Sequence, residues 1–297
     1  MTETTATPTP DRGSVCAALV LERALEGPTR LGVFTDEELT ALDGLATEQI
    51  VPTPWLSAHA EQVSTEIAAG ISLRSLIARR LVLPAEQLAD DWDDLGEDPR
   101  RLYAVDPVQG ILTLRRSASA LTTLQRIVED QSHALVHYDF GQGRALEEEI
   151  THDGFHHFTI LPLVDVPARA MALVDQAEVA QGDGEPRRAR MSEVEQDQEL
   201  AAILGDTRAL TVLSSVRRDA EPAQYTFYAT SDRLLVSRSE DGLDAADPHL
   251  QFVEISAGTA EDLLAEVVGI DPVGDPADDP TGVPSGAPTG DTAADPA

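Results

Sequence analysis

The sequence predicts an α+β fold built from two halves, each with helices, an antiparallel meander of strands and a closing helix. In the N-terminal third, apolar residues recur every three or four positions, which is typical of helices. The period then changes to two over short segments whose links are too short for helical crossovers. A similar order of patterns returns after residue 191. Because 42% of the 297 residues are apolar, the chain can bury a core in one large domain or in two smaller ones.

The first segments of the chain are predicted to be helical. Thr35, followed by three acidic residues, begins a capping box in front of leucines at helical spacing. Residues 58–80 carry aliphatic side chains mostly three or four positions apart. Pro84 can begin a further helix that runs through Trp92. These elements would form the helical part of the first half.

The centre of the chain is predicted to form the first meander. Alternating apolar and polar residues indicate five strands, at 110–116, 121–128, 134–140, 144–151 and 155–161. The segment Gly141-Gln142-Gly143, between the third and the fourth of these, is typical of a hairpin turn. A helix over 166–180 would close the first half.

The second half repeats this order of elements. Ser192 and Glu195 have capping-box spacing in front of a helix that includes Leu200 and Leu204. Four strand candidates follow, at 209–216, 224–229, 233–237 and 250–255. Thr259 would cap the closing helix. No residue-level repeat is visible, but the shared order makes a quasi-two-fold relation between the halves a natural consequence. The sequence leaves open whether the halves share one sheet.

We therefore expect five segments along the chain. They are a disordered N-terminus over 1–12, a first α+β half over 13–180, a linker over 181–191, a second α+β half over 192–270, and a disordered tail over 271–297. The tail contains six aspartates, no basic residue and no large apolar side chain other than two valines. Such a composition cannot offset the conformational entropy that ordering would cost.

The composition excludes several kinds of chemistry and disfavours some partners. All 21 basic residues are arginine, and the absence of lysine and asparagine excludes lysine-based catalysis and Asn-linked glycosylation. The net charge of −32 disfavours binding to nucleic-acid phosphates. The N-terminus lacks the features of a secretory signal, and no apolar stretch is long enough to span a bilayer. We expect a cytoplasmic protein without a membrane partner, in which Cys16, the single cysteine, is a small buried hydrophobe.

The motifs indicate no catalytic or metal site. Five of the seven histidines lie between positions 133 and 157, and clusters of this kind can hold zinc, nickel or iron. However, the flanks are β-rich, and His156 and His157 would point to opposite faces of a strand. We instead expect histidines on adjacent strands, some of them paired with Glu147–Glu149. The acidic stretch from Asp91 fails the calcium-loop pattern, and neither a G-x-S-x-G elbow nor a dinucleotide fingerprint is present. The prediction is a non-enzyme with no catalytic residue, cofactor or metal.

Four segments carry a resemblance to a known family. They are Val33–Leu39, Leu73–Val82, Glu199–Leu204 and Phe252–Val268. In pattern and order they resemble the EspG family of actinobacterial ESX (type VII) secretion chaperones, over roughly residues 30 to 270. The resemblance implies a mixed α/β fold with quasi-two-fold halves. It also implies an apolar surface that binds the helical hairpin tip of a PE/PPE-type client and keeps that client soluble. No motif marks the client-contacting residues.

An alternative hypothesis is a winged-helix DNA-binding regulator with a β-rich effector domain. Residues 73–81 would then be the recognition helix and 111–116 a β wing, with Arg74, Arg79 and Arg80 contacting phosphates. The negative charge of the chain weighs against this hypothesis, so we expect no nucleic-acid partner. A third hypothesis is an α+β structural protein without a partner.

Overall fold

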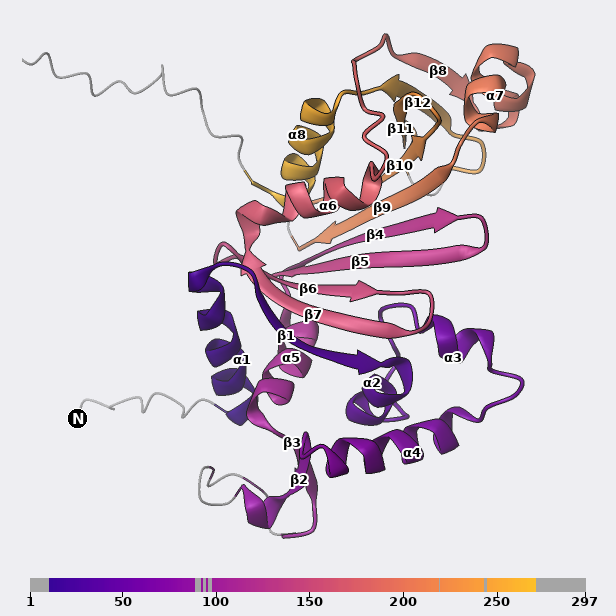
Figure 1. Ribbon diagram of the computed structural model, residues 1–297. Helices are drawn as coiled ribbons and strands as arrows, with labels where there is room; N and C mark the ends of the chain where they lie inside the picture. The colour runs from indigo at the N-terminus through magenta and orange to yellow at the C-terminus, as the bar shows by residue number, and fades with distance from the viewer. Residues whose placement is uncertain are drawn as a thin grey trace, which may run out of the picture.

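The computed structural model describes residues 11–270 apart from 89–91, 93, 94, 96, 97, 219, 243 and 244. The strands of its main sheet are β1 (Thr29–Thr35), β4 (Ala120–Val128), β5 (Gln131–Asp139), β6 (Arg144–Ile150), β7 (Phe155–Pro162), β8 (Arg187–Arg190), β9 (Ala209–Arg217), β10 (Ala223–Ala229), β11 (Leu234–Ser239) and β12 (His249–Glu254). They form one antiparallel sheet in the order β1-β7-β6-β5-β4-β9-β10-β11-β12-β8 (Figure 1). The α+β class is confirmed, and the halves share a single sheet.

Eight α-helices accompany this sheet within the described residues. They are α1 (Arg12–Glu22), α2 (Asp36–Asp43), α3 (Pro54–Ala58), α4 (Thr65–Ala78), α5 (Asp106–Ser117), α6 (Val166–Val174), α7 (Gln198–Gly205) and α8 (Ala257–Val268). A separate two-stranded sheet joins β2 (Val82–Pro84) to β3 (Leu102–Ala104). The capping box predicted at Thr35 forms and begins α2.

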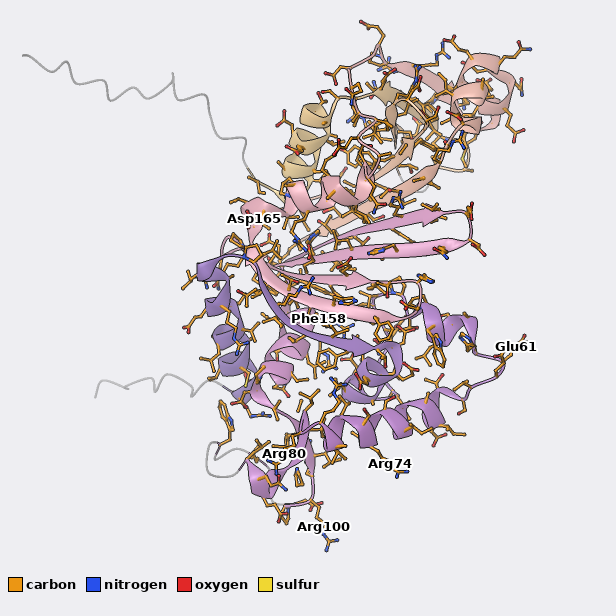
Figure 2. The ribbon with its side chains drawn as sticks, viewed as in Figure 1. Glu61, Arg74, Arg80, Arg100, Phe158 and Asp165 are labelled. Atoms are coloured by element: carbon orange, nitrogen blue, oxygen red, sulfur yellow. The ribbon has the colours of Figure 1, made fainter. Side chains whose placement is uncertain are left out.

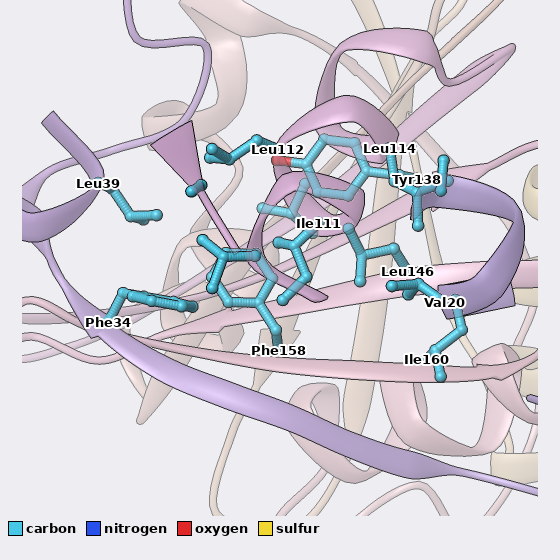
Figure 3. Packing of buried hydrophobic residues seen from close by; sticks show 14 of the residues in the cluster. Val20, Phe34, Leu39, Ile111, Leu112, Leu114, Tyr138, Leu146, Phe158 and Ile160 are labelled. Atoms are coloured by element: carbon cyan, nitrogen blue, oxygen red, sulfur yellow. The ribbon is translucent and has the colours of Figure 1, made fainter. Parts of the chain in front are cut away.

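Helices cover both faces of the sheet, with α1 and α5 on one face and α6 and α8 on the other. Successive side chains of a strand point to opposite faces, so each strand contributes to two layers. We call the face that carries Tyr138, Leu146 and Phe158 the α5 face, because these side chains pack with α1 and α5 (Figure 3). We call the opposite face the α8 face; there Leu124 and Leu213 pack with α6 and α8.

The α1–α5 contact depends on the missing side chain of Gly110. A Cβ atom at this position would lie 2.5 Å from the carbonyl oxygen of Cys16 and 2.6 Å from a methyl group of Val20. The two helix backbones can approach so closely only because position 110 has no side chain. Cys16 itself is buried, as predicted, and burial raises the pKa of its thiol to about 11.

The two halves are related by a quasi-two-fold arrangement of strands about the β4–β9 pair. Moving outward from this pair, β5, β6 and β7 correspond to β10, β11 and β12, and the edge strands β1 and β8 follow. Helix α6 follows β7 just as α8 follows β12. The central pair is Leu124 opposite Leu213, and both are fully buried.

The strand register also reveals a short repeat that the sequence analysis missed. Superposing the two central strands aligns Ala120-Leu121-Thr122 with Ala209-Leu210-Thr211, and Leu124 with Leu213. Four identities over nine residues do not stand out in a 297-residue chain. They become visible once the pairing fixes the alignment.

Several predicted elements differ from those observed. Residues 110–116, predicted as a strand, belong to helix α5, which Pro107 starts within its first turn. Both periods fit this segment, and burial of Val108, Ile111 and Leu112 on one side selects the helix. Pro84 does not begin the predicted helix, because it ends β2 and a 3-10 turn follows at Ala85–Gln87; residues 89–91 of the predicted helix lie outside the described residues.

Other corrections concern boundaries and caps. Helix α1 begins at Arg12 with Asp11 as its cap, so residues 11 and 12 are ordered although the predicted disordered N-terminus extends to residue 12. The segment predicted as a linker, 181–191, contains the edge strand β8. Asp197 caps α7 in place of Ser192, and Ser256 caps α8 in place of Thr259. Residues 1–10 and the predicted tail 271–297 lie outside the described residues.

Candidate protein-docking surface

The centre of the α5 face leaves apolar side chains accessible. We call this surface the central face; it consists of the side chains that β4, β9 and β10 direct to the α5 face, namely Leu121, Thr123, Gln125, Ile127, Leu210, Val212, Ser214, Val216, Gln224, Thr226 and Tyr228. Each of these residues is half-buried or exposed. The α5-face core ends at Leu121, which packs against its border. Since β4 and β9 have nine residues each, the central face is about 30 Å long at about 3.3 Å per residue.

One end of the central face opens into a hollow of about 370 Å³. Leu121 and Val216, which are paired across β4 and β9, contribute to its lining together with Ile50. Val216 is 57% exposed and Ile50 is 59% exposed, so two aliphatic side chains meet solvent at this end. Such a concentration of exposed aliphatic groups beside a hollow is typical of an interaction site.

The charged residues around this hollow have one sign. Within the described part of the chain, its four charged lining residues are Arg115, Arg116, Arg217 and Arg218. The whole chain has 53 acidic residues and only 21 arginines, so a purely basic lining is unusual for this protein. The lining of the hollow is therefore basic, although Arg115 and Arg116 are paired with carboxylates that lie outside it.

A buried ionic network fixes the arginines at this end. Arg115 donates from Nε to Glu148 Oε2 (3.0 Å) and from Nη1 to Asp43 Oδ2 (2.7 Å). Arg116 donates to the other oxygen of Asp43 at 2.6 Å. The Asp43 carboxylate thus holds both guanidinium groups at the C-terminal end of α5, where the helix dipole also favours positive charge.

The same network continues beneath α2 through His156. Its Nδ1 lies 2.7 Å from Glu148 Oε1 and its Nε2 lies 2.7 Å from Asp36 Oδ1. The hydroxyl group of Tyr138 donates to Glu148 Oε2 at 2.6 Å. The side chains of His156, Asp36 and Glu148 are completely buried, so a substrate could reach them only if the fold opened.

Burial and pairing act in opposite directions on the pKa values of this network. Burial alone would lower the pKa of His156, but its hydrogen bonds to Asp36 and Glu148 and their charges raise it. Burial alone would raise the pKa of Glu148, but the hydrogen bond from His156 and the charge of Arg115 lower it. With His156 protonated, three carboxylates face three cations, and the network is neutral.

Two other histidines of the predicted cluster, His133 and His137, lie on β5 and pair with glutamates of β6, as expected, whereas His152 lies in the turn between β6 and β7. His137 Nε2 lies 3.1 Å from Glu147 Oε2, and His133 Nε2 lies 3.1 Å from Glu149 Oε1. His156 and its neighbour in the sequence occupy opposite faces of β7, as predicted. Among the described residues, no three or more His, Cys, Asp or Glu side chains are arranged to hold a metal ion.

The arginines predicted for the DNA-binding alternative lie far from the central face. Arg74 and Arg80 are at the α4 end of the molecule (Figure 2). Arg79 donates to Glu38 Oε1 at 2.6 Å and so holds the end of α4 against α2. The wing required at 111–116 is replaced by helix α5, which packs against α1.

The sequence analysis missed the residues of the central face and the arginines at its end. A signal was present, because β4 and β9 carry large aliphatic residues on both faces. Using that signal requires knowing which face the rest of the chain covers. Arg115 belongs to the predicted strand 110–116, whereas the structure places it on α5 with its guanidinium buried against Glu148.

Comparisons with known proteins leave the family undecided. No protein-family model matches the chain, and a search of curated proteins finds no similar sequence. Within the described residues, none of the helices has the length and apolar character needed to cross a membrane.

Proposed function

We propose that this protein is a non-catalytic, cytoplasmic binding module that holds a helical segment of a partner protein on its central face. The single observation that carries the proposal is the accessible apolar surface over β4, β9 and β10. The resemblance to the EspG family supports the same function, since it implies a helical PE/PPE-type client kept soluble by an apolar surface.

The shape and charge of the central face define the partner segment. A surface about 30 Å long matches an α-helix of about 20 residues at 1.5 Å per residue. An amphipathic helix would place aliphatic side chains over Leu121 and Val216 and one of them in the hollow. An acidic side chain at the end of this helix would face Arg116 and Arg218, because the hollow is lined by arginines.

Co-purification with a candidate client tests this proposal. The tagged full-length chain would be co-expressed with a PE/PPE-type pair, and the complex isolated by size exclusion. We expect the client to co-elute with the native chain in a stoichiometric complex. Val216→Glu should lose the client, because it puts a charge beside the hollow. Ile67→Glu on α4 is a matched control and should keep the client, because Ile67 is 63% exposed and lies outside the central face.

Two results would contradict the proposal. A complex that survives Val216→Glu, or that is lost equally in Ile67→Glu, would show that the central face does not hold the client. A salt-dependent shift of duplex DNA by the purified protein would favour the regulator hypothesis instead.

A further inference from the structure

The α8 face carries two clefts that the quasi-two-fold arrangement relates to each other. The first lies between α6 and strands β5–β6, and the second lies between α8 and strands β10–β12. Following the strand pairing outward from the β4–β9 centre aligns Leu135 with Tyr225 and Glu147 with Val236. Both members of each aligned pair line their own cleft.

The helices that wall the two clefts correspond in the same way. Arg169 on α6 lies eight residues after Leu161, the residue that pairs with Ala145. In the second half the counterpart of Ala145 is Leu234, two residues before Val236. The N–H of Ile255 donates to the carbonyl oxygen of Leu234, and Leu263 on α8 lies eight residues after Ile255. Arg169 and Leu263 therefore occupy equivalent positions, and each lines its cleft.

An ionic cluster occupies the first cleft. Arg169 donates from Nε to Glu147 Oε2 at 2.6 Å and from Nη2 to the other carboxylate oxygen. His137 lies 3.1 Å from the same carboxylate. The arginine side chain crosses from the helix to the sheet, and about 220 Å³ of space remains.

The second cleft has lost every member of this cluster. Val236 stands in place of Glu147, Leu263 in place of Arg169, and Phe227 in place of His137. Nothing bridges helix and sheet at these positions, and the space is about 530 Å³ with a floor of Tyr225, Val236 and Val253. A volume of this size, lined mainly by apolar groups with a few polar ones, is typical of a small-molecule site.

The charged groups that line the second cleft are distributed unevenly. Asp262 and Glu266 lie on the α8 wall at helical spacing. On the opposite side the guanidinium of Arg238 donates to Gln251 Oε1 at 3.2 Å. The lining thus carries two carboxylates against one arginine, and the chain as a whole has a charge of −32. Anionic ligands are disfavoured, and the carboxylates can pair with a cation.

We propose that the second cleft binds a small, mainly apolar molecule with a cationic amine at one end. The apolar body lies against Tyr225, Val236 and Leu263, and the amine faces Asp262 and Glu266. This site is on the sheet face opposite the central face, so it is independent of the partner helix proposed above.

Fluorescence titration with Nile red, a neutral apolar dye, tests the cleft. The decisive variant is Val236→Glu/Leu263→Arg, which copies the Glu147–Arg169 pair that this fold already accommodates at the equivalent positions. We expect saturable binding to the native chain and at least about tenfold weaker binding to the double variant. Leu263→Gln, a milder change at a half-buried position, should weaken binding in the same direction. Circular dichroism verifies that each variant is folded, and Val216→Glu on the central face should bind the dye normally.

Displacement of the dye tests the charge of the ligand. Decylamine and decanoate share an aliphatic body and differ in the sign of their end group. We expect decylamine to displace Nile red at about tenfold lower concentration, and Asp262→Asn/Glu266→Gln to abolish this difference. Equal or better displacement by decanoate would overturn the proposal. Unchanged dye binding by the double variant and by Leu263→Gln would also overturn it, as would loss of binding in Val216→Glu alone.

Discussion

Replacing Glu148 by glutamine should destabilise the fold strongly. Glu148 is fully buried and accepts hydrogen bonds from Tyr138 and Arg115, and it also pairs with His156. Glutamine keeps the shape but removes one of the three carboxylates that balance three cations. An uncompensated buried charge remains, and breaking a buried ion pair in this way costs about 3–5 kcal/mol. Because domains are stable by only about 5–15 kcal/mol, this is a large fraction of the total.

Urea denaturation followed by circular dichroism measures the effect. The matched control is Glu149→Gln, one residue further along β6, where the carboxylate pairs with His133 and both side chains are more than a third exposed. An exposed pair contributes about 0–1 kcal/mol, so this variant should lie close to the native protein. If Glu148→Gln costs less than about 1 kcal/mol, or no more than Glu149→Gln, the network does not stabilise the fold as argued.

Further predictions concern pH and packing. The lowered pKa of Glu148 adds stability above its ordinary value of 4.5 that is lost as pH falls through the folded-state pKa. The raised pKa of His156 adds stability below its ordinary value of 6.5, and this stability is lost as pH rises through the folded-state pKa. The urea concentration at the unfolding midpoint should therefore fall as the pH is raised into the alkaline range. This fall should be absent in His156→Gln. Gly110→Ala should cost about 1–3 kcal/mol by forcing α1 and α5 apart, and an unchanged melting temperature would refute the close contact. Leu213→Ala should cost about 2–5 kcal/mol at the centre of the sheet, whereas Val216→Ala, at an exposed site, should cost far less.

Much of the β structure could be predicted because its sequence pattern has one interpretation. Strands β5–β7 and β9–β12 are short segments of β-type sequence pattern bounded by turn residues, and the sequence predicts each of them within a few residues of its observed bounds. Helix α5 was missed because Ile111–Arg115 fits both periods. Its one-sided burial depends on Gly110 meeting α1 and on Arg115 reaching Glu148, and both are long-range contacts.

The ionic network could be predicted only in part. Pairing of histidines with Glu147–Glu149 followed from the hairpin arrangement of the strands. The involvement of Asp36 did not follow, because Asp36 lies 120 residues from His156 and belongs to a helix whose packing the sequence does not specify. The same holds for Asp43, whose position at the end of α2 brings it to two arginines of α5.

The strands at the centre of the sheet give the strongest argument for a partner. A strand buried on both sides is apolar on both faces, whereas a strand with one solvated face alternates. In β9 the α8 face carries Leu213 and is buried by α6 and α8, yet the opposite face carries Leu210, Val212 and Val216. The β4 strand shows the same pattern with Leu124 on one face and Leu121 and Ile127 on the other. Both strands thus carry large aliphatic side chains on two faces, while the described chain leaves those on the central face half-buried or exposed. A second polypeptide on the central face would account for the difference, and Val216→Glu tests whether it does.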